Sequence, residues 1–167
     1  LPPGTLSTLW NAEDRYRKSY LSHFSGYYET GDAGYLDEDG YLYIMARTDD
    51  VINVAGHRLG TREIEESISS HPNVAEVAVV GVADALKGQV AMAFAVLRDP
   101  QVVAEQAQRL ALEGEVMKVV DRQLGAVARP SRVHFVTVLP KTRSGKVLRR
   151  SIQAIAEGRD PGDLTTI

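Results

Sequence analysis

The sequence predicts an α+β fold, in which a small β-sheet flanked by helices follows a shorter β-rich segment. Hydrophobic residues make up 44% of the 167 residues and charged residues 25%, which is the balance of a chain that folds around a core. From about residue 50 onward, the hydrophobic pattern changes in the order strand, helix, two strands, helix, strand, helix. This order is typical of α+β proteins.

The first segment is predicted to contain one short helix and a hairpin. An amphipathic stretch at residues 13–21 indicates the helix. Residues 27–30 and 34–36 favour short strands, and the acidic run that ends at Gly40 is a turn signal. Residues 41–46 alternate and are rich in aromatic and branched side chains, so we expect them to complete the hairpin.

The second segment supplies the remaining elements. Thr61, with acidic residues behind it in the first turn, predicts the N-cap of a helix that ends near His71. Apolar residues at helical spacing predict a second long helix within 101–124. Strands are expected at 51–54, 74–82, 90–97 and 133–138, a closing helix at 147–156, and a polar tail after it.

Composition excludes several classes of function. The net charge of −3 gives the whole chain no attraction to nucleic acid or to an acidic membrane. The absence of cysteine excludes disulfides, thiolate metal sites and a cysteine nucleophile. The apolar runs are too short to span a bilayer, and no secretory leader opens the chain. We therefore expect a cytoplasmic protein, and we expect the chain, which starts with Leu1, to be a piece of a longer polypeptide.

The stretch at residues 140–146 is the most informative for function. It places Lys146 directly after a Ser-Gly turn, within a cluster of five cations that contains no acid. A cation on such a loop can neutralise phosphate and carboxylate oxygens. A solvated helix terminus is the alternative interpretation. Nucleic-acid binding is disfavoured because no aromatic residues interleave with the cations, which are Lys141, Arg143, Lys146, Arg149 and Arg150.

Four further polar residues are candidates for a site. Asp32 follows a glycine, so its carboxylate could accept hydrogen bonds from the two hydroxyls of a ribose or could cap its own turn. Arg47 ends the next strand and could reach the same sugar, a phosphate or solvent. The adjacent acids Asp49 and Asp50 lack further metal ligands, so we interpret them as a boundary position that absorbs a change in backbone torsion, with solubility and turn formation as the alternative.

Gly56 and Arg58 follow the strand at 51–54. A glycine lets a slender ligand approach the backbone closely, and an arginine offers two parallel donors to a phosphate. A simple turn glycine and an exposed arginine are the alternatives. The four histidines show no spacing typical of metal ligands, and we interpret them as structural.

Together, the segments 28–32, 47–58 and 140–146 resemble the acyl-adenylate-forming (ANL) superfamily, and within it the short-chain acyl-CoA synthetases. The three segments occur in the order and at the spacing of that family, and the similarity covers essentially the whole chain. Residues 1–10 and 157–167 are most similar to the propionyl-CoA synthetase branch, with the acetyl-CoA synthetases as near relatives.

The resemblance implies a division of the chain. Residues 1–48 would end the large AMP-binding domain, residues 49–50 would form the hinge, and residues 51–157 would form the small mobile C-terminal domain, followed by a tail at 158–167. The phosphate-binding loop, the acid pocket and the metal-binding acid would lie upstream. We therefore expect Mg²⁺ to be held outside this chain, and the chain by itself to be inactive.

The implied reaction joins a small carboxylic acid to coenzyme A (CoA) at the expense of ATP, through an acyl-adenylate. The implied substrate is propionate, with acetate or another small acid as the alternative. An alternative function of another class is a non-catalytic module that binds a nucleotide or a partner. In the first step Asp32 would hold the ribose with help from Arg47, while Lys146 would bridge the carboxylate and the α-phosphate. Acetylation of Lys146 by an acetyltransferase, reversed by a deacetylase, would switch this step off.

For the second step the resemblance implies a rotation about Asp49. Gly56 would then line the passage for the pantetheine arm of CoA, and Arg58 would lie near phosphate. Arg122 is a further candidate for contact with CoA, although relatives often carry their arginine before a Gly-Pro pair that is absent here.

Overall fold

The computed structural model describes residues 4–161, apart from the side chains of Met45, Ala46 and Asp49. It divides the chain into two compact units, Leu1–Asp49 and Asp50–Ile167. Within the described residues, no helix has both the length and the apolar character needed to cross a membrane.

The first unit consists of helix α1 (Glu13–Tyr20) and a hairpin of strands β1 (Asp32–Leu36) and β2 (Leu42–Arg47). Both the helix and the hairpin confirm the prediction. Tyr16 is the buried residue of α1, and its hydroxyl donates a hydrogen bond to the Leu6 carbonyl at 2.5 Å.

The predicted strand at residues 27–30 is wrong. This segment packs locally against α1 instead of pairing with a strand: the ring of Tyr28 stacks on that of Tyr20 at 5.0 Å, and the Glu29 amide donates to the Tyr20 carbonyl. Tyr27 and Tyr28 raised the β propensity of the segment, but the ring of Tyr28 packs on helix α1. Burial, together with the neighbouring Tyr20 and Tyr16, raises the pKa of Tyr28.

The second unit is built on a five-stranded sheet. Its strands are β3 (Val51–Val54), β4 (His57–Gly60), β5 (Val74–Asp84), β6 (Gly88–Leu97) and β7 (Arg132–Val136). The order is β4-β3-β6-β5, and β7 also pairs with β6, in parallel. A parallel pair requires a long crossover, and the helix α3 (Gln106–Leu124) provides it. The predicted α+β class is confirmed, whereas β4 is a strand that the sequence pattern did not indicate.

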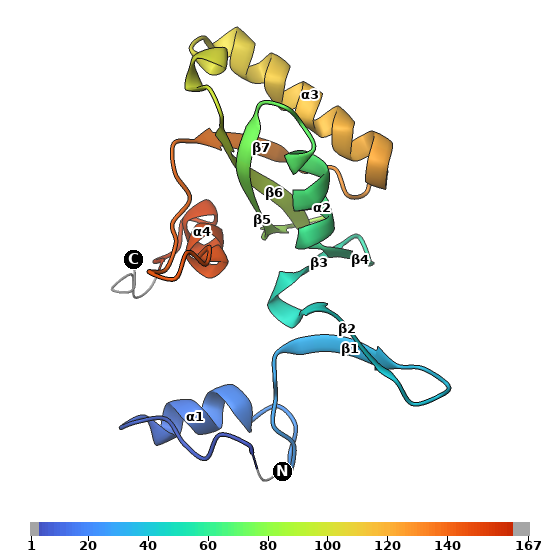
Figure 1. Cartoon of the computed structure of the whole chain (residues 1–167), viewed down its shortest axis with the longest axis vertical. Coiled ribbons are helices and arrows are strands. Elements are labelled where there is room, and N and C mark those ends of the chain that lie inside the picture. The colour runs from blue at the N-terminus through green and yellow to red at the C-terminus, as the bar shows by residue number, and fades with distance from the viewer. Residues whose placement is uncertain (1–3, 162–167) are drawn as a thin grey trace. The chain divides into compact units, whose positions relative to one another are not determined.

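Helices cover both faces of this sheet (Figure 1). Helices α2 (Thr61–Ser69) and α3 pack on one face, around a core that includes Ile64, Ile68, Val116 and Val120. Helix α4 (Arg149–Ala156) packs on the other face, where Ile152 meets the alternate side chains of β5. Short 3₁₀ turns at Thr48–Asp50 and Pro100–Val103 complete the described elements.

The predicted N-cap of α2 is wrong by one residue. Gly60 is the N-cap and has an extended backbone, so Thr61 is the first helical residue. The Thr61 hydroxyl points inward, and within the described residues it has no hydrogen-bond partner. Glu63, in the first turn, still stabilises the start of the helix through the helix dipole.

Side chains provide hydrogen-bond partners for backbone groups at the outer edge of β5. The Val79 amide donates to Glu65 at 2.8 Å and the Ala83 amide to Glu157 at 3.0 Å, while Gln153 donates to the Gly81 carbonyl at 2.7 Å. An edge strand with free amides invites pairing with another chain. Here α2 and α4 occupy those positions and also fix themselves to the sheet.

Candidate functional site

A closed loop presents Lys146 to solvent. The Thr142 amide donates to the Lys146 carbonyl at 2.8 Å, and the Lys146 amide donates to the Thr142 hydroxyl at 3.1 Å. Gly145 has φ of +82°, a left-handed conformation that glycine adopts without steric cost. Lys146 is exposed, and its amine has no ion pair or hydrogen bond with any residue that the structure describes. The loop therefore fixes the backbone of Lys146 and leaves its amine available.

Two other cations around this loop, unlike Lys146, are paired with carboxylates. Lys141 pairs with Glu76 of β5 at 2.6 Å. Arg149 makes two parallel contacts with Glu65 of α2, from Nε to Oε1 at 3.2 Å and from Nη2 to Oε2 at 2.6 Å, and its Nε lies 3.8 Å from the Asp50 carboxylate. The sequence analysis missed both glutamates, because they lie 65 or more positions earlier in the chain. The one available signal for Glu76 was a charge inside an otherwise apolar strand.

Asp32 and Arg47 are brought together in the first unit. They are direct partners across the β1–β2 ladder, and both are exposed. The Arg47 guanidinium lies over Gly31, where an added Cβ would be 3.1 Å from its Nη2 atom. The backbone of Gly31 is held by Thr48, whose amide and hydroxyl both donate to the Gly31 carbonyl. The pair thus offers a carboxylate and a guanidinium side by side.

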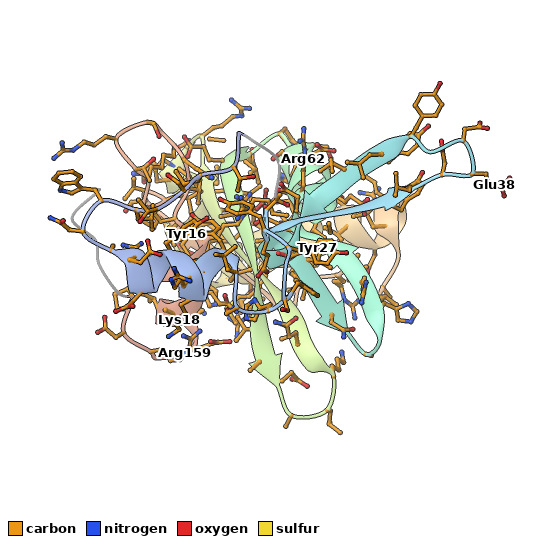
Figure 2. All side chains as sticks on the ribbon, turned by 90° about the horizontal axis from the view of Figure 1, so that it is seen from below. Tyr16, Lys18, Tyr27, Glu38, Arg62 and Arg159 are labelled. Atoms are coloured by element: carbon orange, nitrogen blue, oxygen red, sulfur yellow. The ribbon has the colours of Figure 1, made fainter. Side chains whose placement is uncertain are left out.

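Gly56 lies in a two-residue turn between β3 and β4. Ala55 and Gly56 have φ of +50° and +87°, the left-handed pair of a type I′ hairpin. The Ala55 amide donates to the Lys87 carbonyl at 2.9 Å, so this turn lies beside the turn between β5 and β6. Figure 2 shows both hairpins ending on the same side of the unit. Arg58 is exposed on β4, opposite Asn53.

The turn between β5 and β6 is itself well held. The Asp84 carboxylate accepts hydrogen bonds from the Lys87 and Leu86 amides at 2.9 and 3.0 Å. These backbone donors lower the pKa of Asp84, with a smaller contribution from the charge of Lys87. The turn therefore gives the Ala55-Gly56 hairpin a fixed neighbour.

Arg122 and Asp49 complete the predicted residues. Arg122 is exposed in the last turn of α3, and its Nε donates to the Lys118 carbonyl at 3.2 Å, which is a local contact near the end of the helix. The backbone of Asp49 ends the first unit, within the Thr48–Asp50 turn, and its side chain lies outside the described part of the chain. Among the described residues, no three His, Asp or Glu side chains are grouped as a metal site.

The loop of Lys146 and the turn of Gly56 contact different ends of the β5–β6 hairpin. Lys141, at the base of the Lys146 loop, pairs with Glu76 near the start of β5, whereas the Ala55-Gly56 turn lies beside the turn that follows Asp84. From Glu76 to Asp84 an extended strand covers roughly 26 Å. The Lys146 loop is therefore anchored near one end of β5, and the Gly56 turn lies beside the other end.

Comparison with known proteins gives consistent results. Residues 63–146 match the family model described as the AMP-binding enzyme C-terminal domain. The chain is 61% identical over its whole length to a propionate–CoA ligase of Escherichia coli, of which it covers 27%. It is 47% identical, over 99% of its length, to an acetyl-coenzyme A synthetase of Pyrobaculum aerophilum, of which it covers 24%. The chain thus spans about a quarter of the length of these relatives.

A solved structure agrees with the fold. The o-succinylbenzoate CoA synthetase of Bacillus subtilis, in complex with its acyl-adenylate intermediate, matches with a TM-score of 0.67 at 31% identity. The match covers 90% of this chain and 28% of that protein.

Proposed function

The chain belongs to the family of AMP-binding enzymes, and we propose that it is the C-terminal part of an ATP-dependent short-chain acyl-CoA synthetase that acts on propionate. In the first step the carboxylate attacks the α-phosphate of ATP, and pyrophosphate leaves. In the second step the CoA thiol attacks the acyl carbon of the adenylate, and AMP leaves. The 61% identity to a propionate–CoA ligase supports propionate, and the 47% identity to an acetyl-coenzyme A synthetase makes acetate the second candidate.

The observation that carries this proposal is the available amine of Lys146. Two anions meet in the first step, and their repulsion is part of its barrier. A cation placed between the carboxylate and the α-phosphate lowers that barrier by about 3–4 kcal/mol, the usual value for one well-placed electrostatic contact. Lys146 suits this role because its backbone is fixed while its amine is not engaged by any described residue.

Asp32 and Arg47 suit the nucleotide. A carboxylate accepts two hydrogen bonds from neighbouring hydroxyls, and the adjacent guanidinium offers donors to the same sugar or to a phosphate. Their pairing across β1 and β2 supports a common role. Mg²⁺ is expected from the chemistry of ATP, and we assign its binding to residues outside this chain.

The separation of Lys146 and Gly56 supports alternation of the small domain. After the first step the amine would obstruct the thiol, so this end of the unit must leave. A rotation about Asp49 would bring the opposite end, with Gly56 and Arg58, to the same centre. Gly56 would line the pantetheine passage, Arg58 would face phosphate, and Arg122 is a further candidate for CoA contact.

Modification of Lys146 would regulate the first step. Acetylation removes the positive charge that this step needs, so an acetyltransferase and a deacetylase are the expected partners. The exposure of the Lys146 side chain supports access by such enzymes.

We expect the full-length protein to be located in the cytoplasm, or in the mitochondrial matrix of a eukaryote.

Acid-dependent release of pyrophosphate by the full-length protein tests the proposal. We expect release with ATP and propionate, weaker release with acetate and butyrate, and conversion to the thioester when CoA is added. Absence of release with every acid would contradict the synthetase assignment, whereas a preference for acetate would contradict only the choice of substrate. This chain by itself should release none.

A further inference from the structure

The loop of Lys146 is anchored at both ends by ion pairs to the rest of its unit. Lys141 precedes the loop, and its amine lies 2.6 Å from the Glu76 carboxylate of β5. Arg149 follows the loop at the start of α4, and its Nε and Nη2 make two parallel contacts with the carboxylate of Glu65 in α2. Backbone pairing of Lys141 with Val147 closes the loop between these anchors.

We propose that Lys141 and Arg149 are positioning residues for Lys146. Their ion pairs with Glu76 and Glu65 fix the 142–146 loop to the sheet, so that the amine moves with the small domain as one rigid body. This inference rests on the proposed function, and it assigns to two members of the basic cluster a role other than contact with the substrate.

The Arg149 anchor is the less exposed of the two. The side chains of Arg149 and Glu65 are 29% and 13% exposed, and Glu65 also accepts the Val79 amide. A guanidinium matches a carboxylate with two parallel hydrogen bonds, which fixes direction as well as distance. The same guanidinium lies 3.8 Å from Asp50, which follows the proposed hinge residue. Arg149 therefore connects the loop, α2, the sheet and the chain next to the hinge.

Anchoring matters because the loop is otherwise held mainly by its own hydrogen bonds, which join Thr142, Ser144, Gly145 and Lys146. A displacement of about 1 Å between reacting groups can cost about a hundredfold in rate. A lysine carried by a rotating domain reaches the carboxylate and the phosphate only if its loop is fixed to that domain. Two ion pairs on opposite sides of the loop supply that constraint.

The Lys141–Glu76 pair permits a clean test. Its side chains are 35% and 47% exposed, so its loss should leave the stability of the fold nearly unchanged. In the full-length protein we would compare Glu76→Gln, Lys141→Gln and the double exchange Lys141→Glu with Glu76→Lys. Propionate-dependent exchange of pyrophosphate into ATP reports the first step. Thioester formation from supplied propionyl-adenylate and CoA reports the second.

We expect Glu76→Gln and Lys141→Gln to lower the rate of the first step about three- to fivefold and to leave the second step unchanged. The double exchange should restore most of the first step, because it rebuilds the pair with reversed charges. Glu66→Gln is the matched control: it breaks the exposed pair with Arg62 at 2.9 Å on α2, and should change neither step.

Arg149→Lys tests the second anchor, because it keeps the charge but loses the two parallel contacts. We expect it to slow the first step about tenfold and to spare the second. Amide hydrogen exchange gives a readout without activity: the amides of Thr142, Gly145 and Lys146 should exchange faster in Glu76→Gln, and at the wild-type rate in the double exchange.

Three outcomes would overturn the inference. The first is a normal rate of the first step in Glu76→Gln, and the second is an equal loss of rate in both steps. The third is a first step as slow in the double exchange as in Lys141→Gln, because that result would indicate that Lys141 touches the substrate itself. Failure of the proposed function would look different, because the wild-type protein would then show no exchange with any acid. The hydrogen-exchange comparison would still decide whether the ion pairs hold the loop.

Discussion

At the residue scale, Ala55 has a backbone conformation that suits another side chain better. Its φ of +50° lies in the left-handed region, where the Cβ of an L-residue meets the following carbonyl at a cost of roughly 1 kcal/mol. The turn keeps this geometry because the Ala55 amide is held by the Lys87 carbonyl and because Gly56 supplies the second left-handed position. Asparagine tolerates this region better than alanine does.

We predict that Ala55→Asn stabilises the protein by about 0.5–1 kcal/mol. Thermal unfolding should show a higher Tm. Ala85→Asn is the matched control, because Ala85 lies in the adjacent turn without a positive φ and should give no gain. A lower Tm for Ala55→Asn would show that the methyl group of Ala55 has a role that the turn geometry does not reveal.

The residues of the loop also show what the sequence could and could not predict. The Ser144-Gly145 turn and the exposed Lys146 follow from local composition, because glycine and serine favour turns whatever their surroundings. The partners of Lys141 and Arg149 do not. Glu76 and Glu65 reach the loop only because the sheet places β5 and α2 beside it, and no spacing rule in a single sequence contains that information.

At the element scale, the outer edge of β5 depends on charged and polar side chains. Glu157 accepts the Ala83 amide and is paired with Arg159. The guanidinium of Arg159, followed by the Ala83 amide, lowers the pKa of Glu157 below its ordinary value of 4.5. A carboxylate with a lowered pKa in the folded state stabilises the fold above the ordinary pKa, and this stabilisation is lost as the pH falls through the lowered value.

We predict that Glu157→Gln removes this part of the acid dependence. The Tm of the wild-type protein should exceed that of Glu157→Gln at about pH 6, and the difference should shrink as the pH falls toward about 3. Arg159→Gln removes the other partner of the pair. Its Tm should likewise lie below that of the wild-type protein at about pH 6 and approach it as the pH falls toward about 3. A constant offset between wild-type and variant over this range would contradict the assigned cause.

The elements themselves were predictable where the side chains follow a clear period. The strands β5 and β6 and the helices α2 and α3 bury regular apolar faces, and the sequence pattern indicated each of them. Strand β4 was missed because His57, Arg58 and Gly60 give it no apolar alternation; pairing with β3 forms it. The segment around Tyr28 was misassigned because aromatic residues favour strands but can equally pack on a helix.

At the scale of the whole molecule, the chain divides between Asp49 and Asp50. Asp50 belongs to the second unit and lies near Arg149, so the residues after the division are tied to the small domain. A rotation of that domain then has to be absorbed at or before Asp49, because the chain beyond it is held. This supports the assignment of Asp49 as the hinge.

We predict that Asp49→Pro traps one orientation of the small domain. Proline fixes φ near −65° and also restricts the preceding residue, so the backbone at the hinge loses its second state. In the full-length protein one half-reaction should be lost and the other retained.

Glu38→Pro is the control, because it places proline at the second position of the Asp37–Gly40 turn, where proline is favoured. It should leave both half-reactions normal. If Asp49→Pro also leaves both at the wild-type rate, the hinge lies elsewhere.

Substitution of Lys146 tests the central claim most directly. In the full-length protein, Lys146→Ala should lower propionate-dependent pyrophosphate exchange by about 10²–10³-fold, the rate equivalent of one lost electrostatic contact. Thioester formation from supplied propionyl-adenylate should stay within about twofold of wild type, because the amine has left the centre by then. Arg143→Ala, in the same loop, should change neither step by a comparable amount. Equal losses of both half-reactions in Lys146→Ala would contradict the account.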